Sequence, residues 1–226
     1  MFNKIILAIP HSVGTFNESL WSDPSVRSDA DRWTDWHTDK VFNSTKNQVT
    51  SVIGEVSRFD CDLERLLDDP LEAVGQGIIY SKAQSGATRE VTTELLNSSL
   101  GHWYDYQTNL ENEIEDNSLI IDCHSFPSDL ADVDICIGFN DDDTTPSKEI
   151  IELVKKHFED FGFKVGVNNP YSNSIAPKSN IKYKSLMIEL NKRIYLNEKT
   201  LQEKSYSYKV HNHLNSLYDK LLKAHA

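Results

Sequence analysis

The chain has 226 residues, and its 35 acidic and 23 basic side chains give a formal net charge of −12. A chain of this length can bury a core without disulfides or a structural metal, and we expect one domain over residues 1–226. The acidity argues against a nucleic-acid partner, because such proteins carry a basic patch or stripe. It permits a small anionic substrate, since a few arginines in one cleft outweigh the global charge locally.

The number of cysteines and the lengths of the apolar runs indicate the cellular compartment of the protein. The three cysteines, Cys61, Cys123 and Cys136, form no CxxC pair, and a sparse, odd count is typical of a reduced chain. The apolar run before Pro10 is too short for a secretory signal, and no run approaches the roughly 18 residues that span a membrane. We therefore expect a cytoplasmic protein with no membrane partner, and the oligomeric state stays open.

The N-terminal third is predicted to begin with a buried strand. The continuous apolar run at residues 5–9 is typical of a strand that is covered on both faces. Residues 12–30 are rich in Ser, Asp, Asn and Pro, which predicts a loop. Apolar side chains at helical spacing predict a short helix over 31–44, and weaker patterns favour strands near 53–60 and over 75–80.

The remainder of the chain alternates between helices and strands. Its clearest amphipathic segment covers residues 147–161, where the apolar side chains keep to one stripe. This alternation predicts a layered α/β domain with a mixed, mostly parallel sheet, and functional groups should gather at the carboxyl ends of its strands. We predict helices over 87–116, 147–161 and 198–223 and strands over 118–123, 133–138, 163–167 and 184–191.

Two histidines stand directly after predicted buried strands. His11 follows the first strand and Pro10, and His124 follows the strand at 118–123. Imidazoles at two strand ends can converge on one point, as in catalytic zinc sites built from two histidines and one carboxylate. Loop histidines bonded to the backbone are the alternative, because no local HExxH-type motif supports a metal site.

The third metal ligand would come from another segment. Residues 33–39 offer Asp35, His37 and Asp39, and the two aspartates share one helix face at i and i+4. The aromatic neighbours of these residues could form a dry wall for a metal. The alternative is an amphipathic helix with aspartate in its first turn, where the helix dipole favours a negative charge.

Two arginines and one glutamate fit substrate chemistry. Arg58 and Arg65 flank a strand-like core and could reach one cleft, where guanidinium groups bind carboxylates bidentately. Surface salt bridges are the alternative for this pair. Glu189 lies inside the apolar segment 186–190, where a carboxylate is costly unless it is paired or functional. It would make a general base, unless an edge strand turns it towards water.

These segments resemble the N-formylglutamate amidohydrolase family, which is related in fold to zinc carboxypeptidases and aspartoacylase-type deacylases. The resemblance extends from about residue 5 to residue 200 and rests on six motifs in family order. The family patterns and their matches are Pro-His-Ser-Gly at 10–14 (PHSVG), Asp-Thr-Asp-Trp at 33–36 (WTDW), Arg-x-Val-Asp-Leu-Asn-Arg at 58–65 (RFDCDLER), Ile-Asp-x-His-Ser at 121–125 (IDCHS), Asn-x-Pro-Tyr-Ser-Gly-Gly at 168–174 (NNPYSNS) and Ile-Glu-x-x-Arg-x-Leu-Tyr at 188–195 (IELNKRIY).

The resemblance implies a three-layer α/β domain like that of zinc carboxypeptidases, with a central mixed, mostly parallel sheet flanked by helices. It also implies a hydrolase with one Zn²⁺ ion, held by His11, His124 and Asp35. In that mechanism Glu189 acts as the general base on a metal-activated water. Arg58 stabilises the oxyanion of the tetrahedral intermediate.

The resemblance also implies a small anionic N-acyl amino acid as the substrate. Its carboxylate would be held by Arg65, with Arg193 or Tyr171. The reaction that the resemblance suggests first is cleavage of N-formyl-L-glutamate to formate and L-glutamate, a step of histidine degradation.

The chain departs from the family pattern at positions that concern the substrate more than the fold. Glu64 stands where the family has asparagine, Gln107 where it tends to have histidine, and residues 173–174 (NS) replace two glycines. Two other classes of function therefore stay open. One is a related zinc deacylase or carboxypeptidase-type hydrolase with a different substrate, and the other is a non-catalytic binding protein on the same scaffold.

Overall fold

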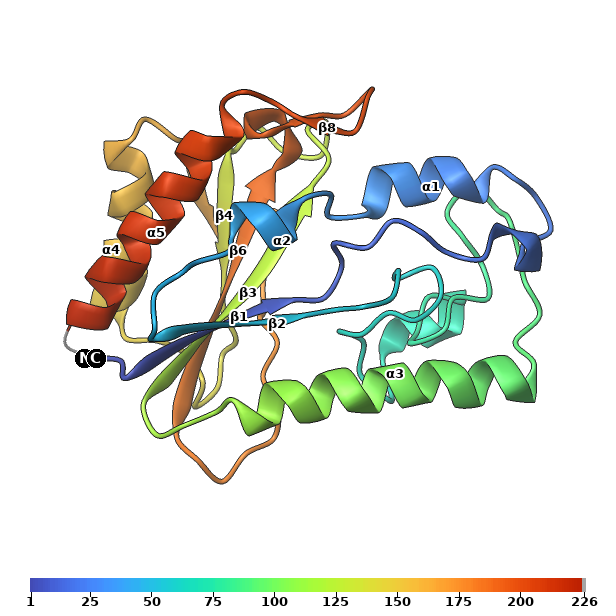
Figure 1. The fold of residues 1–226 in the computed structure, drawn as a ribbon, viewed down its shortest axis with the longest axis horizontal. Coiled ribbons are helices and arrows are strands. Elements are labelled where there is room, and N and C mark those ends of the chain that lie inside the picture. Colours follow the sequence, from blue (N-terminus) through green and yellow to red (C-terminus); the bar gives the residue numbers. More distant parts are fainter. Residues whose placement is uncertain (225–226) are drawn as a thin grey trace.

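Six strands form the central sheet, in the order β2-β1-β3-β6-β4-β5 (Figure 1). The computed structural model describes residues 1–224. Neighbouring strands run parallel, except that β4 is antiparallel to β6. The sheet strands are β1 Lys4–Ile9, β2 Val49–Ile53, β3 Ser118–Phe126, β4 Ile135–Gly138, β5 Val165–Val167 and β6 Tyr183–Asn191.

Helices cover both faces of this sheet and give the domain three layers (Figure 1). On one face α4 and α5 pack against each other, with α2 beside α5, and α3 lies on the other face. The expected fold, an α/β domain with a mixed, mostly parallel sheet between helices, is confirmed. The helices are α1 Val26–Trp33, α2 Thr38–Val41, α3 Thr93–Asn112, α4 Lys148–Asp160 and α5 Ser207–Lys223, with short 3₁₀ helices at Glu18–Leu20, Pro70–Val74 and Lys192–Ile194.

The strands divide their side chains between two apolar cores. In β1, Ile5, Leu7 and Ile9 belong to the core under α4 and α5. Ile6 and Ala8, which point to the opposite face, belong to the core under α3. Both faces are covered, so the central strands carry the continuous apolar runs that mark them in the sequence.

The single helix predicted over 31–44 is wrong. The chain forms two shorter helices, α1 and α2, and α1 begins inside the predicted loop over 12–30. Between the helices, Thr34 is extended and His37 adopts a left-handed conformation with φ of 63°. This break turns Asp35 towards the sheet, where its backbone N–H donates to the His11 carbonyl at 3.0 Å.

The strands predicted near 53–60 and over 75–80 are also wrong. The second strand, β2, ends at Ile53, and the chain turns at Gly54, whose N–H donates to the Ile9 carbonyl at 2.8 Å. A side chain at Gly54 would meet the Pro10 carbonyl oxygen at 2.4 Å, so the close approach requires glycine. Within 75–80 only an isolated bridge forms, between residues 76 and 80.

The other predicted elements are present with shifted ends. α3 starts later than the predicted helix over 87–116, because the Thr92 side chain caps it by accepting a hydrogen bond from the Leu95 N–H at 3.2 Å. Ser147 caps α4 in the same way. The predicted helix over 198–223 corresponds to α5 but starts nine residues later, since the hairpin of β7 (Leu196–Asn197) and β8 (Gln202–Glu203) precedes it.

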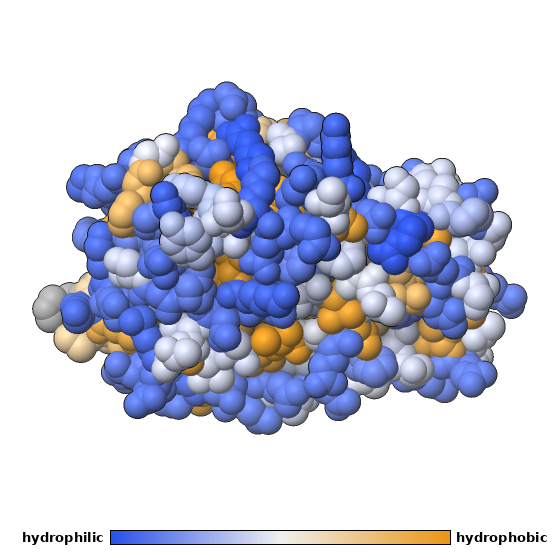
Figure 2. All heavy atoms as spheres, turned by 45° about the horizontal axis from the view of Figure 1, so that its top comes forward, coloured by the Kyte–Doolittle hydropathy of each residue, from blue (hydrophilic) through white to orange (hydrophobic). Residues whose placement is uncertain are grey.

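The surface is mainly polar and the cysteines are unpaired, as the composition of the chain indicates. On the face shown in Figure 2, hydrophilic side chains predominate and apolar ones are scattered among them. Over residues 1–224, no helix combines the length and the hydropathy that crossing a bilayer requires. The cysteines at 61, 123 and 136 are buried and form no disulfide.

Candidate active site

Three neighbouring strands bring polar side chains to one edge of the sheet. β1, β3 and β6 are adjacent and parallel, so their carboxyl ends lie together. His11 follows β1, His124 lies near the end of β3, and Glu189 lies near the end of β6. His124 and Glu189 are direct partners in the strand register. The sheet therefore fixes the relative backbone positions of these side chains.

Each imidazole is oriented by a buried aspartate on its Nε2 side. His11 Nε2 lies 2.7 Å from Asp62 Oδ1, and His124 Nε2 lies 2.8 Å from Asp122 Oδ1. A carboxylate oxygen only accepts, so each Nε2–H donates to its aspartate. Burial opposes the charged form of His124, but Glu64 and Asp122 raise its pKa well above the usual value. Carboxylate–imidazole pairs of this kind set the tautomer of metal-ligating histidines.

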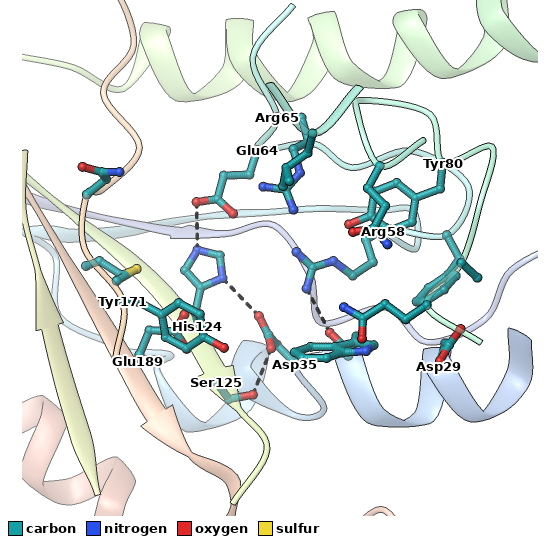
Figure 3. A pocket seen from close by; sticks show the side chains of 18 of the residues that line it. Asp29, Asp35, Arg58, Glu64, Arg65, Tyr80, His124, Ser125, Tyr171 and Glu189 are labelled. Carbon is teal, nitrogen blue, oxygen red and sulfur yellow. Dashed lines mark hydrogen bonds and ion pairs between the residues drawn. The ribbon is translucent and has the colours of Figure 1, made fainter. Parts of the chain in front are cut away.

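Both imidazoles face carboxylates from two other segments, and Figure 3 shows Glu64 and Asp35 at the two nitrogens of the His124 ring. Asp35 Oδ2 lies 3.1 Å from His124 Nδ1 and 3.7 Å from His11 Nδ1. Glu64 Oε2 lies 3.9 Å from His11 Nδ1, and Glu64 Oε1 lies 3.5 Å from His124 Nε2. Ligand atoms of His11, Glu64 and His124 lie within 4.8 Å of one another, so this group could hold a metal ion.

The protonation of these groups suits a divalent cation. Burial disfavours the charged form of Asp35, yet the nearby imidazoles of His11 and His124 hold its pKa well below the usual range. Burial also opposes the ionisation of Glu64, but the nearby His124 and His11 lower its pKa to about 2. Among the described residues, His11 Nδ1 is buried without a hydrogen-bond partner. Ionised carboxylates beside such a nitrogen form a donor set that zinc accepts.

Glu189 lies next to this group in the wall of a cavity. Its Oε2 atom is buried and has no hydrogen-bond partner within the described chain. Burial raises the pKa of Glu189 to about 8, and the negative charges of Asp35 and Glu64 add to the shift while His124 opposes it. The alternative of a solvent-facing edge strand does not apply, because β6 lies between β3 and β4.

Arg58 and Arg65 converge on one buried carboxylate, that of Asp62. Arg58 Nη2 lies 3.3 Å and Arg65 Nε lies 3.4 Å from Asp62 Oδ2, to which the Tyr80 hydroxyl donates at 2.7 Å. Burial opposes the ionisation of Asp62, but the charges of His11 and Arg58 hold its pKa well below the usual range. Both guanidinium groups line the same cavity as Glu189, so they are not surface salt bridges.

The cavity has a volume of about 510 Å³ and lies beside His124 and Glu189 (Figure 3). Tyr171 contributes to its wall, and burial raises the pKa of this tyrosine to about 12, so the hydroxyl stays protonated. Arg193 does not line the cavity, since its Nε donates to Asp134 at 2.9 Å. The structure thus brings Tyr171, but not Arg193, to the candidate site.

Most of the chain matches one protein family. The family model described as N-formylglutamate amidohydrolase matches residues 3–196. The chain belongs to the N-formylglutamate amidohydrolase family. A search of the curated proteins by sequence finds no relative of the chain.

Two solved structures share the fold of this family member. The N-formylglutamate amidohydrolase of Ralstonia eutropha JMP134 is 19% identical, covers 98% of this chain and 94% of its own, and superposes with a TM-score of 0.77. The gene product Atu2144 of Agrobacterium tumefaciens is 15% identical, with coverages of 97% and 92% and a TM-score of 0.67. Both likenesses concern the fold.

Of the three candidate metal ligands in the segment 33–39, only Asp35 reaches the site of this N-formylglutamate amidohydrolase family member. Asp35 lies between the two Nδ1 atoms, and the Ser125 hydroxyl donates to its Oδ1 at 3.0 Å. His37 and Asp39 do not line the cavity. His37 instead donates from Nε2 to the Leu201 carbonyl at 2.9 Å.

Sequence reasoning missed Glu64 and Asp62 as partners of the histidines. Glu64 occupies the position of an asparagine in the family pattern, so it suggested a change in substrate binding. In the structure the loop after β2 returns to the sheet edge and brings Glu64 within reach of both imidazoles. Three acids lie between Arg58 and Arg65 in the sequence, and nothing in their spacing indicates which of them turns towards the histidines.

Proposed function

We propose that the chain is a metal-dependent amidohydrolase that cleaves the amide bond of a small N-acyl amino acid. The reference substrate is N-formyl-L-glutamate, which would yield formate and L-glutamate. The convergence of His11, His124 and ionised carboxylates beside the unpartnered oxygen of Glu189 carries this proposal. A candidate base next to a divalent-metal site in a cavity is the constellation that metal-assisted hydrolysis requires.

One zinc ion would be held by His11, His124 and a carboxylate. The position of Asp35 Oδ2 near both Nδ1 atoms supports Asp35 as the third ligand. Glu64 is the second candidate, because it approaches His11 Nδ1 and His124 Nε2 and forms with these residues a group that could hold a metal ion. When bound, the ion acidifies a water molecule and polarises the substrate carbonyl.

Glu189 would take a proton from the attacking water and deliver it to the leaving amine. This role is supported by its buried, unpartnered Oε2 in the cavity wall. Burial raises the pKa of Glu189 to about 8 in the metal-free chain, and a bound dication would favour the ionised form that accepts the proton. Arg58 would stabilise the developing oxyanion, because bonds to the Trp33 carbonyl at 3.1 Å and to Asp62 hold its guanidinium in place before the reaction.

Arg65 and Tyr171 would bind the free carboxylate of the substrate. Both side chains line the cavity, and Tyr171 keeps a hydroxyl hydrogen to donate. A guanidinium and a hydroxyl donor together satisfy a carboxylate. Arg193, which is paired with Asp134, would play no direct part.

The proposal is tested with purified full-length protein and a substrate panel. N-formyl, N-acetyl and longer N-acyl amino acids, each with and without a free carboxylate, are assayed for release of the amine, and bound metal is measured by elemental analysis. We expect stoichiometric zinc and hydrolysis that requires the free carboxylate.

The matched pair of variants is His124→Asn and His102→Asn. His124→Asn should lose both metal and turnover, whereas His102 is exposed on α3 and its substitution should change neither. A chain that binds no metal and hydrolyses nothing in the panel contradicts the proposal and favours a binding protein.

A further inference from the structure

One buried carboxylate in the cavity wall has no part in the chemistry described above. Asp29 lies on α1, is only 8% exposed and lines the cavity. In the close view it lies across Asp35 and Arg58 from His124, away from the candidate metal position (Figure 3). The cavity therefore has a second polar end.

Asp29 has no cationic partner among the residues that the structure describes. Its Oδ2 accepts one hydrogen bond, from the Ser85 N–H at 2.7 Å, and none of the ion pairs formed within residues 1–224 includes it. The two arginines of the cavity, Arg58 and Arg65, are both directed to Asp62. A buried carboxylate is costly unless it is paired, so the missing partner would have to enter with the ligand.

The surroundings of Asp29 are apolar and aromatic. Its helix neighbours Val26 and Ala30 belong to a buried cluster with Phe59 and Tyr80. Trp33 stands one turn further along α1, at i+4, and therefore shares a helix face with Asp29. The aromatic rings of Trp33, Phe59 and Tyr80 line the cavity together with this carboxylate. Aromatic faces next to a carboxylate attract organic cations.

The size of the cavity also exceeds what the reference substrate needs. At about 510 Å³, it falls within the range of roughly 300–1,000 Å³ that holds drug-sized ligands. N-formylglutamate is much smaller than such ligands, and its side-chain carboxylate would be repelled by Asp29. The far end suits a longer side chain of opposite charge.

We infer that Asp29, with Trp33 beside it, forms a subsite for a positively charged group, an ammonium or a guanidinium, at the end of the substrate's side chain. The inference rests on the proposed function and narrows its substrate class to N-acyl derivatives of basic amino acids. Asp29 is then a specificity-determining residue that touches the substrate away from the scissile amide.

The test compares substrates that differ only in this charge. kcat/KM is measured for N-formyl-L-lysine and N-formyl-L-arginine, for the uncharged N-formyl-L-norleucine and for N-formyl-L-glutamate. We expect the wild-type chain to prefer the cationic substrates over norleucine by about 10-fold or more, the scale of a charge-assisted hydrogen bond in a buried site. Equal values for cationic and neutral side chains overturn the inference.

The variant is Asp29→Asn, whose side-chain oxygen can still accept the hydrogen bond from the Ser85 N–H. If Asp29 only anchors that loop, the preference for cations survives; if it binds the cation, the ratio of lysine to norleucine substrate falls towards one. Asp31→Asn is the control on the same helix, because Asp31 is paired with Arg27 outside the cavity and the ratio should not change.

A binding measurement separates this inference from the proposed function. Free L-arginine and L-norleucine are titrated into the wild-type and Asp29→Asn chains by calorimetry. Selective, Asp29-dependent binding of arginine without any hydrolysis supports the subsite and contradicts the amidohydrolase. Hydrolysis of N-formyl-L-norleucine with no selectivity for arginine supports the amidohydrolase and contradicts the subsite.

Discussion

At the scale of single residues, Glu189 offers the sharpest test of the chemistry. Glu189→Gln keeps the volume and the strand but removes the group that accepts a proton. We expect turnover to fall by roughly 10²-fold or more, the scale for loss of a positioned general base, with zinc content unchanged. kcat and metal content are measured on the same preparation, and near-normal turnover would falsify the assigned role.

The burial of Lys192 should make the free energy of unfolding of the chain depend on pH. It lies in the 3₁₀ helix after β6, is 2% exposed and donates from Nζ to the Arg32 carbonyl. Burial lowers its pKa from 10.5 to about 8, although the charge of Asp35 opposes this shift. Between these two pH values the unfolded chain therefore holds a proton that the folded chain has lost, and stability rises with pH.

The measurement compares the metal-free wild-type chain with Lys192→Met by chemical denaturation. Relative to the variant, the wild-type free energy of unfolding should increase by about 3 kcal/mol from pH 8 to pH 10.5, because a difference of one bound proton changes this free energy by about 1.4 kcal/mol for each step of one in pH. Subtracting the variant removes the titration of all other groups. A difference that stays constant over this window contradicts a buried, proton-poor lysine.

The residues of the site differ in how far the sequence can predict them. Three of these residues, His11, His124 and Glu189, lie in or directly after apolar runs that form parallel strands. Because the carboxyl ends of parallel strands lie together, the sequence alone predicts that these side chains come close to one another. Glu64 follows an irregular turn, and its direction depends on the close approach at Gly54 and on the buried Asp62. The pattern of apolar and polar residues carries no information about such tertiary contacts, so the place of Glu64 in the site could not be predicted from the sequence.

At the scale of elements, the break between α1 and α2 is held by a close contact with Gly14. A Cβ at Gly14 would lie 2.0 Å from Cη2 of Trp36, the neighbour of Asp35. Gly14→Ala should therefore push Trp36 and weaken the site, with a loss of stability of about 1–3 kcal/mol, as for other overpacked positions. Thermal unfolding and zinc content are the two measurements.

Gly101 provides the opposite case in a regular helix. It lies within α3, and nothing lies within 4 Å of a Cβ added there. Gly101→Ala should stabilise the chain by about 0.5–1 kcal/mol, because alanine has the higher helix propensity, and it should leave zinc content unchanged. If Gly14→Ala and Gly101→Ala shift the midpoint of thermal unfolding in the same direction, then the close contact between residue 14 and Trp36 is not what makes alanine unfavourable at position 14.

The elements themselves divide into two groups by predictability. Buried strands and helices with an apolar stripe follow from period and composition, and β1, β3, β6 and α4 are correctly predicted. Residues 26–44 and 54–80 could not be, because aromatic side chains at helical spacing hide a left-handed residue at His37, and the turn at Gly54 comes from packing against Pro10. The conformation of these two segments is determined by tertiary contacts rather than by local conformational preference.

At the scale of the whole molecule, metal binding should be coupled to folding. The site gathers buried carboxylates of a chain whose net charge is already −12, and a dication relieves their repulsion. Zinc at a thousandfold excess over its dissociation constant should stabilise the native chain by about 4 kcal/mol. A chelator should lower the unfolding temperature and zinc should restore it, as followed by calorimetry.

The control for this coupling is a chain without the imidazole. His124→Asn should show no zinc-dependent shift, whereas His102→Asn should shift as the wild type does. An equal shift in His124→Asn means that zinc binds elsewhere and contradicts the site.

His124 and Glu189 are paired across two central strands, so their positions are fixed by the sheet, whereas other residues of the cavity are free to vary. Backbone hydrogen bonds between β3 and β6 hold these two positions, whereas the far wall of the cavity comes from a 3₁₀ helix, at Leu71, and from loops, at Gln76, Ala83 and Gln84. Diversifying those four positions in a library would vary the choice of substrate while His124 and Glu189 stay in register. If His124 and Glu189 act in the reaction as proposed, substitutions in the far wall would change which substrates fit and leave the catalytic geometry intact.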